Sequence, residues 1–379
     1  MQNRSIKRRS HRTARLYRLA TRMHSAVPYH VFRDGYAFPA WHYFLEVTRR
    51  CNLRCAMCQY RKWFESAPGS EQREDELTTS EWRDVIGQTG RLSLITFTGG
   101  EPFVRDDLLE LLEFASQLRR THIITNGLRL TEDVAKRLVE LAPANVAGRG
   151  LHFVGVSLEG PRDVHDAITG MAGAYDKAVQ GLKALVRYRK ESGKTRPLVH
   201  ITAVIQQDNL GSLARLPAVA TELGADALNL VTEIRMFDPE NVGELDPDAF
   251  RSSDVTLPRL APTALDGALQ AAADAAAELG VAVRWPRMPR ADLVQYYDGG
   301  LDLGEYACRA AWTNMYVAAK GDASSCLIHR AGNVRDKPLK AIWNGPEMRQ
   351  WRQCRRRGLT CLCQGCCELE HKGNPTQAV

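Results

Sequence analysis

No apolar run in the 379-residue sequence approaches the ~20 residues that a membrane-spanning helix needs. The N-terminus is basic but lacks the apolar stretch of a secretory signal, so we expect a cytoplasmic protein. Without an export signal the ten cysteines do not predict a disulfide framework, because cytosolic thiols are kept reduced.

Cysteine is also absent from most of the chain. None lies between residues 59 and 307, whereas three lie within 51–58 and seven within 308–367. Cysteines scattered through a core would not leave a gap of that length. Their clustering therefore predicts two separate metal or cluster sites.

Acidic residues are absent from the first 22 positions, which hold eight Lys and Arg. The other 43 basic residues nearly balance the 44 acidic ones, so the net charge of +7 resides in this arm. Apolar residues recur opposite the arginines at helical spacing, namely Leu16, Leu19, Ala20 and Met23. The pattern fits an arm that binds an anionic membrane surface, a nucleic acid or an acidic partner. The alternative is a solvated arm packed on the barrel.

Six short runs rich in β-branched residues alternate with helical patterns from residue 43 onward. Strands separated by single helices predict βα units and a parallel sheet. Six units favour a partial (β/α)6 TIM-like barrel over a closed eight-unit barrel, with a doubly wound sheet as the alternative. In either architecture the chemistry lies at the carboxyl ends of the strands. The runs are 43–48, 92–98, 121–126, 152–158, 198–205 and 227–232.

Composition divides the chain into four regions. A polar, Pro-rich linker with a last helix and strand follows the barrel core, and a small α+β domain closes the chain. In that last domain we expect a hairpin turning at Gly321-Asp322 and a helix interrupted at Gly345-Pro346. The predicted regions are a basic arm at 1–40, the core at 41–232, the linker, helix and strand at 233–290, and the C-terminal domain at 291–379.

Three cysteines, Cys51, Cys55 and Cys58, directly follow the first strand run, in the sequence CNLRCAMC. Three thiolates on one loop can hold three corners of a [4Fe–4S] cluster and leave the fourth iron open. Structural zinc sites and electron-transfer ferredoxins instead use four protein ligands. The incomplete set predicts that another molecule binds the exposed iron.

This CxxxCxxC motif, together with TFTGGEPF after the second strand run, resembles the radical S-adenosylmethionine (radical SAM) superfamily over roughly residues 43–232. The resemblance implies that the amine and carboxylate of SAM chelate the open iron. It also implies that an external reductant, of flavodoxin or ferredoxin type, drives cleavage of SAM to methionine and a 5′-deoxyadenosyl radical. That radical abstracts hydrogen from an unactivated C–H bond of the substrate.

The GGEP segment suits a ligand site. Adjacent glycines let the backbone approach a small molecule, and a carboxylate can accept hydrogen bonds from an ammonium group. By the resemblance, that ammonium is the amine of SAM. Glu159 stands where the family more often has aspartate, and Thr169 where an arginine for the SAM carboxylate often lies. Asn126 and Gln206 either contact SAM or cap the following turns. The candidate SAM contacts are Gly99, Gly100, Glu101, Pro102, Asn126, Ser157, Glu159 and Gln206.

The C-terminal cysteines resemble the SPASM/Twitch extension that many radical SAM enzymes carry. The resemblance implies one auxiliary [4Fe–4S] cluster, with a zinc knuckle as the structural alternative. Cys354, Cys361 and Cys367 are possible substitutes among the ligands. The expected ligands are Cys308, Cys326, Cys363 and Cys366.

An auxiliary cluster beside the barrel suits removal of a second electron, so we expect net oxidation, either dehydrogenation or bond formation. The 40 residues ahead of the barrel favour a small natural-product or sugar-type substrate over a peptide with a leader. Epimerisation stays open, because Cys354 or a spare C-terminal cysteine could donate the hydrogen atom that this reaction needs. Peptide maturation and a lipid or membrane-attached substrate are further alternatives. Two alternatives are minor. A full six-unit barrel with a SAM loop argues against a non-catalytic iron–sulfur or zinc-binding regulator. A nucleic-acid-modifying enzyme is supported only by the N-terminal charge, and no aromatic platform interleaves the basic residues.

Overall fold

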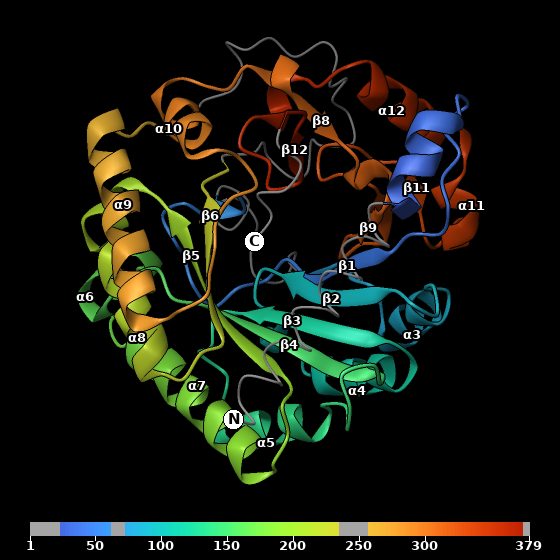
Figure 1. The fold of residues 1–379 in the computed structure, drawn as a ribbon. Coiled ribbons are helices and arrows are strands. Elements are labelled where there is room, and N and C mark those ends of the chain that lie inside the picture. Colours follow the sequence, from blue (N-terminus) through green and yellow to red (C-terminus); the bar gives the residue numbers. More distant parts are fainter. Residues whose placement is uncertain (1–22, 62–72, 235–256, 374–379) are drawn as a thin grey trace.

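A curved parallel sheet forms the centre of the protein (Figure 1). The structure is a computed structural model that describes residues 23–61, 73–234 and 257–373. All six predicted strand runs are strands, and each pairs in parallel with the next one along the chain. This order is that of a barrel, because a doubly wound sheet would reverse its strand order near the middle. The strands are β1 (His42–Thr48), β2 (Leu94–Gly99), β3 (Arg120–Thr125), β4 (Gly150–Ser157), β5 (Leu198–Ile205) and β6 (Ala227–Thr232).

Helices cover the outer face of this sheet (Figure 1). Two of them begin as their sequences predict: Thr78 and Glu81 form a capping box, and the Thr131 hydroxyl accepts a hydrogen bond from Val134 N–H. The short helix α6 (Arg162–Thr169) was not predicted. The others are α3 (Thr79–Gly87), α4 (Leu108–Leu118), α5 (Glu132–Glu140), α7 (Ala174–Glu191), α8 (Leu216–Glu222) and α9 (Pro262–Leu279).

Burial alternates along β3. In β3, Thr121, Ile123 and Thr125 are buried, whereas the residues between them are partly exposed. Because the helices lie outside, the partly exposed side chains face the interior of the barrel. The interior is therefore open enough to admit a ligand.

The C-terminal hairpin continues the barrel's sheet. Strand β9 (Asn314–Val317) pairs in parallel with β1, and β10 (Asp322–Ser324) and β11 (Gly332–Asn333) follow it in antiparallel order. The predicted turn is confirmed: Gly321 has a φ of +92°, where an L side chain would be strained. At the other edge, β7 (Val283–Arg284) pairs with β6. Within the described residues the sheet has ten strands.

The rest of the C-terminal segment packs beside the β9–β10 hairpin. Strands β8 (Tyr306–Cys308) and β12 (Leu369–His371) form a separate two-stranded sheet. The interrupted helix is confirmed as α11 (Leu339–Trp343) and α12 (Pro346–Arg357), and α10 (Arg290–Asp298) precedes β8. No helix in the described ranges has the length and apolar character that crossing a bilayer requires.

Part of the predicted basic arm is a helix over residues 23–31. The Tyr29 ring meets Trp312 edge-on at a centroid distance of 4.9 Å, and Arg356 donates to the Tyr29 carbonyl oxygen at 3.1 Å. Residues 1–22, with eight of the basic side chains, lie outside the described residues, as does most of the Pro-rich linker.

Candidate active site

A cavity of about 320 Å³ opens at the carboxyl ends of the central strands. It lies where the strand order predicted chemistry. Of the residues predicted to bind the first cluster or SAM, three do not line it: Glu101, Pro102 and Gln206. The predicted residues that do line it are Cys51, Cys55, Cys58, Gly99, Gly100, Asn126, Ser157 and Glu159.

The three cysteines of the first motif face this cavity together. Burial, and then the nearby charged groups, raises the pKa of Cys51 to about 11 and that of Cys55 to about 12. For Cys55 those groups are Glu159 and the other two thiols. Thiols crowded in this way resist ionisation on their own, and bound metal ions relieve that cost because they stabilise thiolates.

Hydrogen bonds fix the cysteine loop from two sides. The backbone N–H groups of Arg54 and Ala56 donate to the carbonyl oxygens of Thr169 and Ile168 in α6. The Leu53 N–H lies 3.4 Å from the Cys51 sulfur. Thr169 is buried and lines the cavity, and its hydroxyl donates to the His165 carbonyl oxygen at 2.8 Å, so it supplies no cation at this position.

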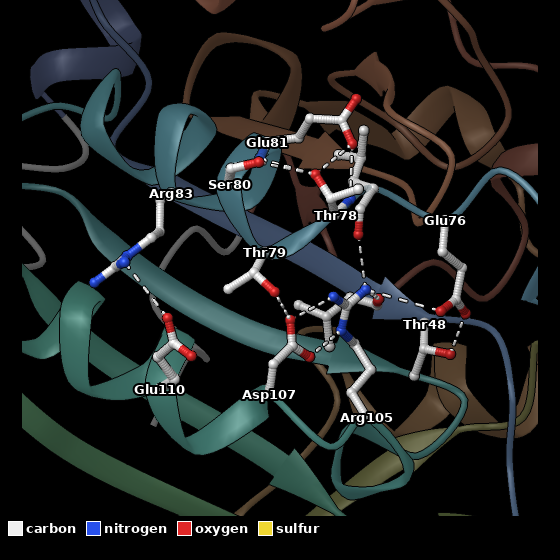
Figure 2. A network of polar contacts seen from close by, with 12 residues as sticks. Thr48, Glu76, Thr78, Thr79, Ser80, Glu81, Arg83, Arg105, Asp107 and Glu110 are labelled. Atoms are coloured by element: carbon white, nitrogen blue, oxygen red, sulfur yellow. Dashed lines mark hydrogen bonds and ion pairs between the residues drawn. The ribbon is translucent and has the colours of Figure 1, made fainter.

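A buried ionic network supports the chain just ahead of Cys51 (Figure 2). Arg105 donates to both carboxylate oxygens of Asp107, at 2.8 and 2.7 Å, and to the carbonyl oxygens of Val47 and Leu77, at 3.1 and 3.0 Å. Glu76 accepts from the Thr48 hydroxyl and lies 3.8 Å from Arg105. The network therefore holds the end of β1 in place beneath the cysteine loop.

The two glycines of GGEP pack against the same stretch of backbone. A Cβ at Gly99, whose φ is +147°, would lie 2.1 Å from the Thr48 carbonyl oxygen. A Cβ at Gly100 would lie 2.3 Å from the carbonyl oxygens of both Arg49 and Arg50. The close approach that requires glycine here is thus to residues 48–50, the backbone that leads into the cysteine loop, a contact that the sequence did not reveal.

We expect Gly100→Ala to weaken SAM binding by about tenfold, because the backbone carbonyls must shift to admit the methyl group and overpacking costs ~1–3 kcal/mol. Equilibrium dialysis of the reconstituted protein with labelled SAM measures this loss. Gly87→Ala is the matched control, since nothing lies within 4 Å of the added carbon in α3. Equal affinities in the two variants would contradict the packing described here.

Glu101 is fully buried and ties the GGEP loop to β3. Its carboxylate accepts from the Phe103 N–H at 3.0 Å, the Thr125 hydroxyl at 2.8 Å and the Asn126 N–H at 2.7 Å. Burial raises its pKa to about 6, although these hydrogen bonds favour the charged form. In this structure the carboxylate positions the loop, and a bond from it to the SAM amine stays a prediction.

Glu159 lines the cavity at the end of β4. One carboxylate oxygen accepts from the Val204 N–H at 2.8 Å, and burial raises the pKa of the group to about 7. The Asn209 side chain donates to the Glu159 and Val204 carbonyl oxygens and accepts from the Gln206 N–H. Gln206 and Asn209 therefore cap the turn after β5, as the alternative interpretation had it.

His165 also lines the cavity, and sequence analysis did not single it out. Its Nδ1 accepts from the Glu159 N–H at 3.1 Å, so Nε2 carries the proton of the neutral ring. Burial lowers the pKa of His165 to about 4, and Nε2 has no hydrogen-bond partner among the described residues. An orphaned donor beside the cavity, together with the three thiols, fits a site built for an iron–sulfur cluster and a polar ligand such as SAM. The HDAITG stretch after β4 was the only signal for it in the sequence.

The second cysteine group gathers between the two-stranded sheet and the hairpin. Burial, then Cys326 and Cys363, raises the pKa of Cys308 to about 12. A hydrogen bond between the Cys366 thiol and Cys367, then burial, raises the pKa of Cys366, and Cys326 and Cys308 add to that effect. The four predicted ligands are thus brought together, with Cys367 beside them. Among the described residues, no group of three Cys, His, Asp or Glu side chains has the arrangement that binds a single metal ion. The assignment of a cluster to these cysteines therefore rests on the proximity of their thiols.

Cys354 lies on α12, outside the run of cysteines at 361–367. Its sulfur accepts a hydrogen bond from the Arg357 guanidinium at 3.1 Å. Cys354 stays a predicted substitute among the ligands.

Two segments of the chain match known domains. Residues 45–209 match the radical SAM superfamily, and residues 308–367 match SPASM, an iron–sulfur cluster-binding domain. These domains imply SAM, a SAM-binding [4Fe–4S] cluster and auxiliary [4Fe–4S] ligation as the cofactor set.

Individual proteins are similar over different lengths. Fe-coproporphyrin III synthase of Methanosarcina barkeri is 40% identical over 139 residues, which cover 36% of this chain and 31% of that protein. The AdoMet-dependent heme synthase of the same organism is 24% identical over 80% of this chain and 82% of that protein. Streptococcus suis SuiB, solved with bound S-adenosylmethionine, gives a TM-score of 0.58 at 16% identity, with 87% of this chain and 71% of that chain covered. At that identity the likeness to SuiB shows the fold.

Proposed function

Because the chain belongs to the radical SAM superfamily and carries a SPASM iron–sulfur cluster-binding domain, we propose that it removes two electrons from a small-molecule substrate. When bound, the first cluster and SAM supply the 5′-deoxyadenosyl radical that takes hydrogen from the substrate. The protein itself binds, orients and shields the reactants.

The residues around the cavity suit that task. Cys51, Cys55 and Cys58 would hold the first cluster, and Gly99 and Gly100 line the same cavity while packing against the backbone just ahead of Cys51. Asn126, Ser157 and Glu159 would receive the polar groups of SAM. With a pKa of about 7, the Glu159 carboxyl can accept or donate a hydrogen bond to a ribose hydroxyl near neutral pH.

The position of Tyr316 carries the proposal of net oxidation. This residue of β9 stacks on Phe44 of β1 at a centroid distance of 4.6 Å, on the interior face of the sheet. Burial, then Glu368 and the thiols of Cys367, Cys366 and Cys326, raises its pKa. The second cysteine group therefore adjoins the barrel interior, where an auxiliary cluster can take an electron from a substrate.

The interior also carries groups that suit a carboxylated substrate. Arg284 of β7 donates to Nδ1 of His200 on β5 at 3.2 Å. Burial, then His122 and Arg287, lowers the pKa of His42 to about 3, so Arg287 also acts on this interior. The Arg287 guanidinium is already paired with Glu368 at 3.0 Å, however, so Arg284 carries this argument. Guanidinium groups bind carboxylates in a bidentate fashion. Since the AdoMet-dependent heme synthase is similar over most of both chains, carboxylated tetrapyrroles are the first substrates to test.

The test uses reconstituted protein, SAM and dithionite with coproporphyrin-type substrates in deuterated water. Oxidation predicts one 5′-deoxyadenosine per product and a product that has lost hydrogen without gaining solvent deuterium. A product of unchanged composition that carries one solvent deuterium would instead indicate epimerisation. A peptide substrate accepted in place of every tetrapyrrole would overturn the proposed substrate class.

Cys326→Ala separates the two cluster sites. We expect this variant to keep forming 5′-deoxyadenosine while its oxidised product falls to background, because only the second cysteine group is broken. Retained SAM cleavage also shows that the variant is folded. Cys354→Ala is the matched control and should behave as the unmodified protein. Full product formation by Cys326→Ala would contradict an oxidising role for the second site.

A further inference from the structure

The helix over residues 23–31 presents an apolar stripe to solvent. Met23, Val27 and Val31 are 62%, 41% and 62% exposed, and their spacing of four residues places them on one face. We call these three side chains the stripe.

The opposite face of this helix is firmly attached to the protein. Besides the contact between Tyr29 and Trp312, Nε2 of His24 lies 2.9 Å from the Pro39 carbonyl oxygen, and Ser25 and Pro28 are buried. Arg356 caps the far end by donating to the Phe32 and Arg33 carbonyl oxygens, at 3.1 and 2.8 Å. The stripe is therefore displayed on a fixed helix, and the described residues leave it uncovered.

Basic residues precede and follow the stripe along the chain. The 22 residues that lead into the helix contain eight Lys and Arg and no acid, and the first acidic residue of the chain is Asp34. Asp34 is already paired with Arg349 at 2.8 Å. At the other end, Arg33 and Arg357 are exposed, whereas Arg355 is buried and Arg356 is held by the backbone carbonyl oxygens of Phe32 and Arg33. An apolar stripe flanked by cations is complementary to a surface that is anionic outside and apolar beneath.

We propose that the stripe docks this protein on an anionic lipid bilayer, with Met23, Val27 and Val31 in the acyl boundary and the basic residues among the headgroups. Aliphatic side chains suit acyl chains, whereas single-stranded nucleic acids are bound on aromatic platforms, and the stripe has none. The contact is peripheral, since no described helix is suited to cross a bilayer. This docking is independent of the proposed substrate and would bring the enzyme to hydrophobic or membrane-held reactants.

The test is co-sedimentation of the full-length reconstituted protein with vesicles of phosphatidylglycerol and phosphatidylcholine, compared with vesicles of phosphatidylcholine alone. Binding is expected on the anionic vesicles only and should weaken as salt is raised, because the headgroup attraction is screened. The triple variant Met23→Ser, Val27→Ser, Val31→Ser should bind about tenfold more weakly while SAM cleavage is unchanged.

A second triple variant serves as the matched control. Leu92, Val146 and Leu279 are 76%, 42% and 44% exposed elsewhere on the surface, and their replacement by serine should leave vesicle binding intact. Equal binding by the two triple variants, or no preference for anionic vesicles, would overturn the proposal. So would a stripe-dependent dimer in size-exclusion chromatography without vesicle binding, since the stripe would then meet a second copy of the chain. Stripe-dependent binding to an acidic polypeptide or to single-stranded RNA, but not to vesicles, would likewise assign it another partner.

Discussion

Cys55→Ala is expected to abolish 5′-deoxyadenosine formation and to lower the iron content by about four per chain, because two thiolates do not hold a [4Fe–4S] cluster. Cys55 is the central thiol of the loop, and its environment is shared with Cys51, Cys58 and Glu159. Removing it leaves the loop's hydrogen bonds to α6 intact, so the loss should be confined to the cluster.

Anaerobic reconstitution followed by iron analysis and chromatographic detection of 5′-deoxyadenosine measures both effects. Cys354→Ala again provides the control, since it removes a partly buried thiol outside the three-cysteine motif. If Cys55→Ala kept its iron and still cleaved SAM, the three-thiol site would be refuted.

Arg105→Met is expected to destabilise the protein by about 3–5 kcal/mol, because it leaves the buried partners of a charged network uncompensated. Asp107 would lose its cation, and the Val47 and Leu77 carbonyl oxygens would lose a donor, whereas Glu76 keeps its ion pair with Arg50 at 3.1 Å (Figure 2). Since Val47 immediately precedes the turn into the cysteine loop, the variant should also retain less iron.

Unfolding of the reconstituted protein in urea, followed by circular dichroism, measures the destabilisation. Arg83→Met is the matched control. Arg83 lies near Arg105 in Figure 2, but Arg83 and its partner Glu110 are about half exposed. An exposed pair contributes less than about 1 kcal/mol, so the control should unfold close to the unmodified protein. Similar midpoints for the two variants would show that the Arg105 network does not stabilise the end of β1.

The barrel could be predicted from the sequence because its signals are local. Each central strand is a short β-branched run, and Thr78 and Thr131 mark helix starts within a few residues of the helices they cap. The break between α11 and α12 is likewise encoded where it occurs, at Gly345-Pro346. The parallel order of the strands then places the three cysteines and the glycines at one end of the sheet.

Other features depend on contacts between distant parts of the chain. The pairing of β9 with β1 brings Tyr316 against Phe44. No local sequence pattern specifies the edge of the sheet to which the hairpin binds. The Glu101 carboxylate is held by hydrogen bonds from Thr125 and Asn126, which lie at the end of β3. The GGEP motif alone does not show this structural role, because the donors are distant in the sequence. His165 was overlooked because its orphaned nitrogen becomes informative only once its neighbours are known.

The most direct measurement of the central claim is anaerobic reconstitution with iron and sulfide analysis, followed by addition of SAM and dithionite. Two clusters, one held by Cys51, Cys55 and Cys58 and one by the C-terminal cysteines, predict about eight irons per chain, cluster absorbance and formation of 5′-deoxyadenosine. Zinc in place of iron, without cluster absorbance and without SAM cleavage, would contradict it.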